Sequence, residues 1–198
     1  MADNSAAGAQ PGSLPAIHHT YRADAKHYTK GRWRIPLLGI SDRIEYAVLH
    51  NTEGRDSRAW LSTTSNPPAS IHALIDRAGA RWNIVDYNDT AWHVGKARSP
   101  YRNSNSLGLE LENRSNPRGV SEDYTPAQIN TAAHWLATVM FSYGIPWLNV
   151  VRHGDIALPA GRRADPSNFP MDDFRLRTDA WLLFFRNLPE ASHSLYII

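Results

Sequence analysis

The stretch TPAQINTAAHWLATVMFSYGIPWLNVV, residues 125–151, contains the signals of a helix followed directly by a strand. Thr125 is suited to the N-cap, Pro126 to the first helical position, and Gln128 to the third residue of a capping box. Gly144 is placed to end the helix, and the proline that follows shortly after prevents its continuation. Between these signals, apolar residues recur at helical spacing and predict one core-facing stripe: Ile129, Ala132, Ala133, Leu136, Met140 and Tyr143.

Strand signals lie on both sides of this helix. LNVV at 148–151 predicts a buried strand that leads into His153, and IEYAVLH at 44–50 is a similar apolar run that also ends on a histidine. SIHALIDRAGARWNIVD, residues 70–86, is typical of two strands joined by a turn at Gly79. The sequence therefore alternates between strands and helices from about its first quarter onward.

Two further elements complete the predicted architecture. SLGLELEN at 106–113 alternates, so its leucines share one face of a strand while Gly108, Glu110 and Glu112 share the other. A last helix is expected over roughly 171–187, with its inner side formed by Phe174, Trp181, Leu182, Phe185 and Leu188. This order predicts an α/β fold, a single domain with a central mixed β-sheet flanked by helices.

The composition narrows the available chemistry. The chain has 198 residues, 42% of them hydrophobic, which suits one domain with a substantial core. No window approaches the roughly 20 apolar residues of a membrane-spanning helix, so we expect a soluble protein. The absence of cysteine excludes disulfides, thiolate metal ligands and a cysteine nucleophile, which leaves histidines and carboxylates as possible ligands.

The first 40 residues differ from the rest. Residues 1–40 hold five Lys and Arg against two Asp, a net charge of +3 in a chain whose total is +2. We expect a flexible, basic N-terminal extension that either attracts a polyanion or is simply solvated. It lacks the features of a secretory signal, so synthesis in the cytoplasm without a signal peptide is expected. It also lacks a recognisable nucleic-acid-binding motif, so no nucleic-acid partner is expected.

Candidate metal ligands gather in VVRHGDIALPAGRRADPSNFP, residues 150–170, which contains His153 and Asp165. His50 and His153 would both leave the carboxyl ends of central strands, where open α/β sheets usually bind ligands. Two imidazoles and one carboxylate suit a catalytic metal ion that keeps an open position for water. The alternative is two strand-end histidines bonded to backbone and an Asp165 that opens a turn before proline. The spacing has no local signature that favours either.

The other histidines are weaker candidates. His134 lies opposite the apolar stripe of the 125–146 helix, so we expect it to be exposed. Four more are expected to lie in the tails: His18, His19, His27 and His193.

Four stretches resemble segments of one protein family, in that family's order. YAVLHNTEG resembles its first zinc-ligand strand, and ASIHALIDRAGARWNIVDYNDTAWHVGKA resembles its hairpin and the A-W-H-x-G loop that follows. NSNSLGLELEN resembles its N-x-x-S-I-G-I-E-L strand, and the 150–170 stretch resembles its G-H-x-D-I-A-P-G-R-K-x-D-P-G segment. Together they cover about residues 43–185. The chain is thus similar to the zinc-dependent N-acetylmuramoyl-L-alanine amidases, which include phage endolysins, a muropeptide-recycling amidase and peptidoglycan recognition proteins.

This resemblance implies an amidase catalytic domain over residues 41–198 that holds Zn²⁺ through His50, His153 and Asp165. Glu110 takes the place of a glutamate found in the recycling-type branch. The resemblance also implies three residues that line the substrate groove: Asn51, Trp92 and His93.

The implied reaction is hydrolysis of the amide bond between N-acetylmuramic acid and L-alanine of peptidoglycan. Glu110 would help to deprotonate the attacking water and then protonate the leaving amine. Arg163 stands where the family has lysine, and because a guanidinium stays charged, its expected role is to stabilise the tetrahedral anion. Glu112 shares the predicted face of Glu110, but the family register favours Glu110.

Other departures from the family pattern limit the comparison. The loop from His153 to Asp165 is two residues longer than the family pattern, and Ile71 stands where the phage-lysozyme branch has a tyrosine. A tyrosine-assisted mechanism is therefore not expected at that position. His72 matches a recurrent family histidine, whose role is open between the site and the packing of the fold.

The resemblance leaves three functions to compare. The first is a phage-type endolysin, stored in the cytoplasm and released onto the cell wall, whose anionic envelope the basic extension would contact. The alternative is a cytoplasmic muropeptide-recycling amidase, which Glu110 and Asn51 favour. A binding module without activity is less expected, because all three ligand positions are filled.

Overall fold

The computed structural model describes residues 18–20, 22–30, 43–116 and 118–189. Within these residues, six strands form a mixed sheet in the order β1-β5-β4-β7-β3-β8. All neighbouring pairs are parallel except β4 and β5, which are antiparallel. The strands are β1 (His18–Thr20), β3 (Tyr46–Asn51), β4 (Ala73–Ile75), β5 (Arg81–Asn83), β7 (Ser106–Leu111) and β8 (Val150–Arg152). The predicted α/β fold with a central mixed sheet is confirmed.

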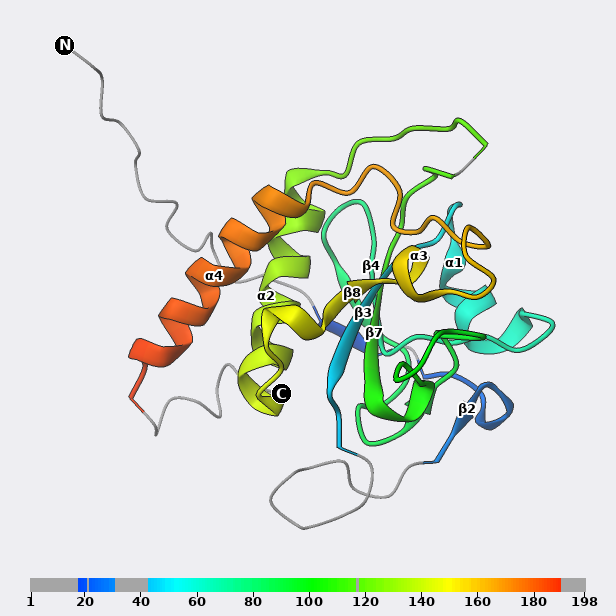
Figure 1. The fold of residues 1–198 in the computed structure, drawn as a ribbon, viewed down its shortest axis with the longest axis horizontal. Helices are drawn as coiled ribbons and strands as arrows, with labels where there is room; N and C mark the ends of the chain where they lie inside the picture. The colour runs from blue at the N-terminus through cyan, green and yellow to red at the C-terminus, as the bar shows by residue number, and fades with distance from the viewer. Residues whose placement is uncertain (1–17, 21, 31–42, 117, 190–198) are drawn as a thin grey trace.

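Two long helices lie on one side of this sheet, and short helical segments lie on the other (Figure 1). The long helices are α2 (Pro126–Tyr143) and α4 (Met171–Asn187), which agree closely with the predicted ranges. The short segments are α1 (Ser57–Ala59), the π-helical turn η3 (Trp60–Thr64) and α3 (His153–Ile156). The 3-10 turns are η1 (Ala25–His27), η4 (Asn103–Asn105) and η5 (Trp147–Asn149).

The ends of α2 form as the sequence predicts. The Thr125 side chain accepts a hydrogen bond from the backbone of Gln128, and the Gln128 side chain accepts one from the backbone of Thr125. At the other end Gly144 takes a left-handed conformation with φ of 67°, and its N–H donates to the Met140 carbonyl. Local chemistry thus fixes both ends of the helix before any tertiary contact is considered.

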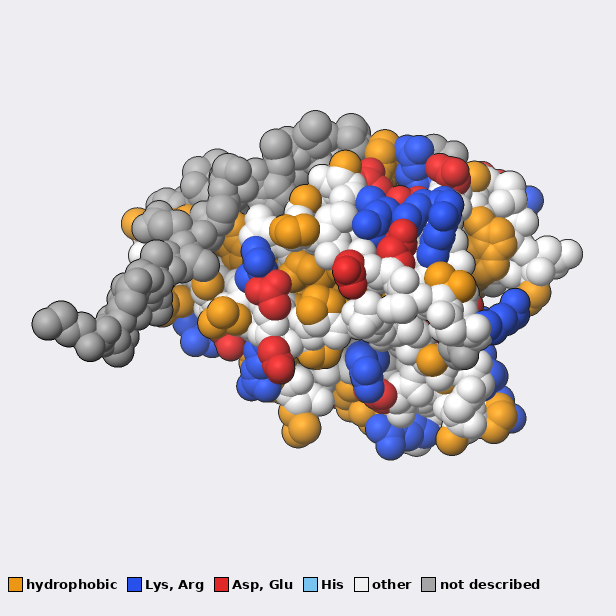
Figure 2. All heavy atoms as spheres, turned by 90° about the horizontal axis from the view of Figure 1, so that it is seen from above, with side chains coloured by type: hydrophobic (Ala, Val, Ile, Leu, Met, Phe, Trp, Pro, Cys, Tyr) orange, Lys and Arg blue, Asp and Glu red, His pale blue; other side chains and the backbone are white. Residues whose placement is uncertain are grey.

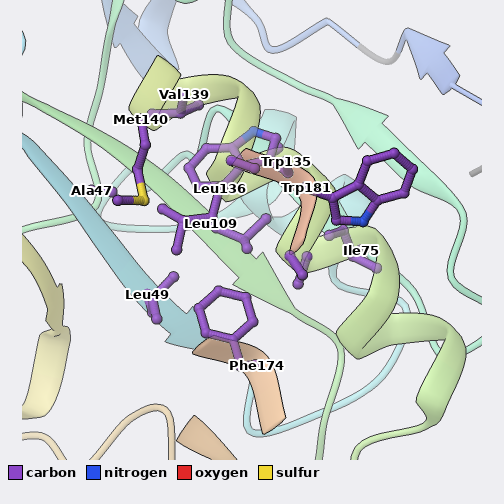
Figure 3. Packing of buried hydrophobic residues seen from close by; sticks show 14 of the residues in the cluster. Ala47, Leu49, Ile75, Leu109, Trp135, Leu136, Val139, Met140, Phe174 and Trp181 are labelled. Atoms are coloured by element: carbon purple, nitrogen blue, oxygen red, sulfur yellow. The ribbon is translucent and has the colours of Figure 1, made fainter. Parts of the chain in front are cut away.

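The main core lies between the sheet and the two long helices (Figure 3). The three leucines of β7 all point into it, as the alternation predicts: Leu107, Leu109 and Leu111. Glu110 therefore faces the opposite side of the sheet. His134 is not exposed, contrary to expectation. It is 5% exposed and its ring packs against Trp181 and Phe185, because α4 covers the side of α2 that a one-stripe pattern leaves to solvent.

The expected N-terminal extension over 1–40 needs correction for residues 18–20 and 22–30. β1 joins the edge of the main sheet beside β5, and β2 (Tyr28–Thr29) pairs with β6 (Thr90–Ala91). His27, expected in a tail, is 1% exposed. Residues 1–17 and 31–42 lie outside the described residues, as do His193 and the apolar C-terminal end. A contact between the basic extension and an anionic envelope stays a prediction.

The strand that precedes His153 also differs from expectation. β8 lies at the edge of the sheet beside β3, and its two valines are only partly buried while Arg152 is exposed. Among the described residues, no helix combines the length and apolar character needed to cross a bilayer.

Candidate metal centre and active site

The site begins where β3 and β7 end side by side. His50 on β3 is the direct register partner of Glu110 on β7, and both side chains are buried on the face away from α2. Leu49, the neighbour of His50, points into the main core, so strand alternation sends the imidazole to the other face. His153 follows β8 immediately, and β8 pairs with β3. Two neighbouring parallel strands therefore deliver the two histidines to one edge.

A backbone contact brings Asp165 back to His153. The N–H of Gly154 donates to the carbonyl of Asp165 at 2.7 Å, which closes the loop between them. A Cβ at Gly154 would lie 3.0 Å from the backbone of Ala164, so a larger residue would push the two ends of this loop apart. The two extra residues of this loop lie within the closed segment and leave its ends in contact.

The three side chains converge. Nδ1 of His50 lies 3.1 Å, and Nδ1 of His153 lies 3.0 Å, from Oδ2 of Asp165. One ligand atom from each residue fits within 4.8 Å of the others. Oδ1 of Asp165 is buried and has no hydrogen-bond partner among the described residues. Two nitrogens and a carboxylate in this arrangement fit a divalent metal ion such as Zn²⁺.

The protonation states also suit metal binding. Burial lowers the pKa of His50 to about 4, although its hydrogen bond to Asp165 acts in the opposite direction. Burial alone would raise the pKa of Asp165, but hydrogen bonds to His153 and His50 outweigh it and hold that pKa well below its ordinary value. At neutral pH the pair therefore offers a neutral imidazole and a carboxylate, the forms that bind metals.

Glu110 has the features expected of a general acid and base. Burial raises its pKa well above the ordinary value, the nearby Asp165 and Glu53 carboxylates raise it further, and the charge of Arg163 lowers it in part. Arg163 is itself exposed, close enough to influence both Glu110 and His50. Glu112 lies beyond the end of β7, and its Oε1 accepts a hydrogen bond from the backbone N–H of Asp56. The geometry thus separates the two glutamates.

The three predicted groove residues are placed differently. Asn51 is 4% exposed, and both the oxygen and the nitrogen of its side-chain amide are hydrogen-bonded to backbone groups of the protein. Trp92 is partly exposed and its indole N–H donates to Oγ1 of Thr29. His93 is partly buried and lies against His50, with Nδ1 3.1 Å from His50 Nε2. The structure therefore places His93 beside the candidate metal centre, and Asn51 bonds within the protein; substrate contact by these residues stays a prediction.

Sequence reasoning left other residues near the centre without a role. His72 is fully buried, and its Nδ1 accepts from the Gly108 N–H while its Nε2 contacts the Asp89 carbonyl, which gives it a packing role. Tyr124 lies close enough to Glu110 and Asp165 for their charges to raise its pKa beyond what burial does. Because its position depends on the loop before α2, no spacing in the sequence indicates it.

The sequence around the candidate metal centre matches one protein family. Residues 41–168 match the family described as Amidase_2, N-acetylmuramoyl-L-alanine amidase. The chain belongs to this amidase family. The amidase match includes both histidines and the aspartate of the candidate metal centre.

Named amidases of the same kind are similar to the chain. It is 33% identical over 138 residues to N-acetylmuramoyl-L-alanine amidase AmiD of Escherichia coli, with 63% of this chain and 49% of that protein covered. It is 32% identical over 104 residues to 1,6-anhydro-N-acetylmuramyl-L-alanine amidase AmpD of Haemophilus influenzae, with 50% and 53% covered. The chain thus spans about half the length of these curated relatives.

A solved structure of AmiD from E. coli resembles the fold. It is a complex with the substrate anhydro-N-acetylmuramic acid-L-Ala-D-gamma-Glu-L-Lys, with a TM-score of 0.60 and 28% identity. The match covers 77% of this chain and 66% of that one.

Basic and acidic side chains also pair elsewhere on the surface. Arg55 and Arg77 both pair with Glu122. The face shown in Figure 2 likewise has basic and acidic side chains intermixed. The described part of this face therefore offers no uniform basic surface for a polyanion.

Proposed function

We propose that the chain is a zinc-dependent amidase that cleaves the bond between N-acetylmuramic acid and L-alanine in soluble 1,6-anhydro-muropeptides. The observation that carries the proposal is the convergence of His50, His153 and Asp165 beside the buried Glu110, in a member of this amidase family. The expected endolysin activity is less well supported. The AmpD relative is named for an anhydro sugar, and AmiD was solved with an anhydro-muramyl peptide.

Each residue has a distinct part in this proposal. His50, His153 and Asp165 would hold Zn²⁺. When bound, the ion would supply Lewis-acid activation of water and of the scissile carbonyl. Glu110 takes a proton from the attacking water and returns it to the nitrogen of L-alanine as the amide bond breaks. Its raised pKa suits both halves of this task, because the group must accept and release a proton near neutral pH.

Arg163 stabilises the negative charge that develops on the carbonyl oxygen. It is exposed and its charge reaches Glu110, so it lies at the open side of the site where substrate enters. A guanidinium keeps its proton, so its contribution is electrostatic and proton transfer stays with Glu110.

The test compares two substrates and one metal. The purified full chain is incubated with a 1,6-anhydro-muramyl peptide and with intact peptidoglycan, each with Zn²⁺ or with a chelator. New L-alanine amino groups that form faster on the soluble peptide, and only with metal, support the proposal. Faster release from intact walls would restore the endolysin function, and new reducing sugar ends would refute amidase chemistry. The matched variants are Asp165→Ala, expected to be inactive and to lose zinc, and Asp155→Ala on the exposed surface, expected to keep both.

A further inference from the structure

One turn of the chain contacts both candidate histidine ligands from behind. Nδ1 of His93 lies 3.1 Å from Nε2 of His50, and the carbonyl of the next residue, Val94, lies 3.1 Å from Nε2 of His153. These are the outer nitrogens of the two imidazoles, because the inner Nδ1 atoms face Asp165. Two consecutive residues thus occupy the second contact of both rings.

A single side chain holds this turn in place. Oδ1 of Asn103 accepts a hydrogen bond from the backbone N–H of His93 at 3.1 Å and from that of Val94 at 2.8 Å. Asn103 begins the 3-10 turn η4, which leads directly into β7. The turn is therefore fixed to the strand that carries Glu110.

The direction of the hydrogen bond to His50 follows from a neighbouring hydroxyl. Ser106 Oγ donates its one proton to the carbonyl of Arg102 at 2.7 Å, so it can only accept from Nε2 of His93 at 3.3 Å. With its proton on Nε2, a neutral His93 presents a lone pair at Nδ1. His50 is then the donor, through its Nε2 proton.

The direction of the hydrogen bond between His153 and Val94 follows from the acceptor alone. The carbonyl of Val94 can only accept, so Nε2 of His153 must carry the proton. With a metal ion bound, both rings would then present their Nδ1 lone pairs to it beside Asp165, in place of the Nδ1 hydrogen bonds to Oδ2 of Asp165 that form without it. This is the tautomer in which two imidazoles can bind one metal ion through those atoms.

A glycine provides the room that His93 needs. A Cβ at Gly108 would lie 2.7 Å from Nδ1 and 2.8 Å from Cγ of His93, and 2.5 Å from Cδ1 of Ile71. A Cβ essentially never comes this close to another atom, so any other residue at position 108 would force the His93 ring and Ile71 to move. The His93 ring therefore lies directly against the backbone of β7, where its position is fixed on one side by the sheet.

We propose that the His93–Val94 turn, held by Asn103, positions both metal-binding imidazoles and sets their tautomer. His93 is thus a positioning residue that acts through His50, in place of the substrate contact that its motif implies. This inference rests on the proposed function, because it takes the metal centre for granted. It adds that zinc affinity depends on a residue that is not a ligand.

The experiment measures zinc affinity and catalysis in the full chain. His93→Leu removes the acceptor for His50, and the dissociation constant for Zn²⁺, measured by competition with a chelator, is expected to rise about 10- to 100-fold. His93→Asn places an acceptor oxygen near the position of Nδ1 and is expected to recover most of the affinity. At saturating zinc, His93→Leu should lower kcat and leave KM for the muropeptide nearly unchanged.

Controls separate this role from others. Trp92→Phe removes the neighbouring indole donor to Thr29 and is expected to keep the zinc affinity of the wild-type chain. Asn103→Ala, which releases the whole turn, is expected to weaken zinc binding at least as much as His93→Leu. Melting temperatures of the zinc-free variants show whether each protein remains folded.

Two results would overturn the inference. Unchanged zinc affinity in His93→Leu with a raised KM would return His93 to the substrate groove. Equal losses of affinity in His93→Leu and His93→Asn, with lower melting temperatures in both, would reduce its role to packing. If the wild-type chain itself bound no zinc, the proposed function would fail instead, so the two failures are distinguishable.

Discussion

The side-chain oxygen of Asn51 accepts a hydrogen bond from the backbone N–H of Ser167 at 2.9 Å. Asn51 ends β3, one residue after His50, and Ser167 lies two residues after Asp165. The Asn51 amide nitrogen also donates to the carbonyls of Asn113 and Ser115, at 3.2 and 2.8 Å. One buried amide thus joins the end of β3 to the loop after β7 and to the loop that carries a candidate ligand.

Asn51→Ala is therefore expected to destabilise the protein. It removes the partner of the partly buried Ser167 N–H and of the buried Ser115 carbonyl, and one of two donors to the Asn113 carbonyl, which should lower the free energy of unfolding by on the order of 2 kcal/mol. Thermal or denaturant unfolding measures the change. Asn88→Ala, at an exposed position in a turn, is the control and should unfold like the wild-type chain. Wild-type stability with a raised KM would contradict this prediction and support the groove position that the family resemblance implies.

The role of Arg163 can be tested with one variant that keeps its positive charge and one that removes it. If its charge stabilises the developing oxyanion, Arg163→Lys should keep substantial activity while Arg163→Ala loses about 100-fold in kcat/KM. Steady-state hydrolysis of an anhydro-muramyl peptide gives both values. Arg118→Ala, which removes an exposed charge from another loop, is expected to have no such effect. An alanine variant at Arg163 with full activity would remove this residue from the mechanism.

The sequence correctly predicted those features of the fold that depend only on residues near one another in the chain. The capping box at Thr125, the left-handed Gly144 and the alternation that turns Glu110 away from the core all formed as predicted. The predictions that were wrong concern residues whose surroundings are set by tertiary contacts. His134 is buried because α4 packs on it, and β1 joins the sheet by pairing with β5, some 60 residues later, which no local period encodes.

The candidate site shows the same division. The family motifs indicated His50, His153 and Asp165, and the structure brings these three together. The same motifs implied substrate contact for Asn51 and His93, which stays a prediction, and they gave no indication of the hydrogen bonds that these side chains make within the protein. Their hydrogen bonds to Ser167 and to His50 involve residues 116 and 43 positions away in the chain. Such contacts become visible only when the chain is folded.

Glu110→Gln is expected to lose amidase activity and to raise the melting temperature of the zinc-free protein. In the unfolded chain this carboxyl has an ordinary pKa of about 4.3, whereas burial raises its pKa in the folded protein. Between these two pKa values the folded state binds more protons, so ionisation of Glu110 reduces stability as pH rises through that window. The glutamine variant lacks this penalty. Zinc-free Glu110→Gln should therefore melt above the wild-type chain at neutral pH, and the difference should shrink as pH falls toward about 4.

Melting temperatures of both zinc-free proteins across this pH range test the prediction. The variant should also lose nearly all amidase activity, because it can no longer transfer a proton. Glu112→Gln is the matched control and should keep activity, since the Glu112 carboxylate contacts the backbone of Asp56 outside the centre. A melting difference that does not change with pH would show that ionisation of Glu110 is not the cause.

Two glycine substitutions distinguish damage to the fold from damage to the centre. A Cβ at Gly79 would lie 2.9 Å from the carbonyl oxygen of Ala127, and its φ of +85° is unfavourable for other residues. A Cβ at Gly108 would meet Ile71 and His93. Both alanine variants should lose on the order of 1 to 3 kcal/mol of stability. Only Gly108→Ala should also weaken zinc binding, because it displaces the ring that holds His50. Zinc competition assays below both melting temperatures provide the comparison, and equal zinc affinities in the two variants would show that the space above Gly108 does not control the metal centre.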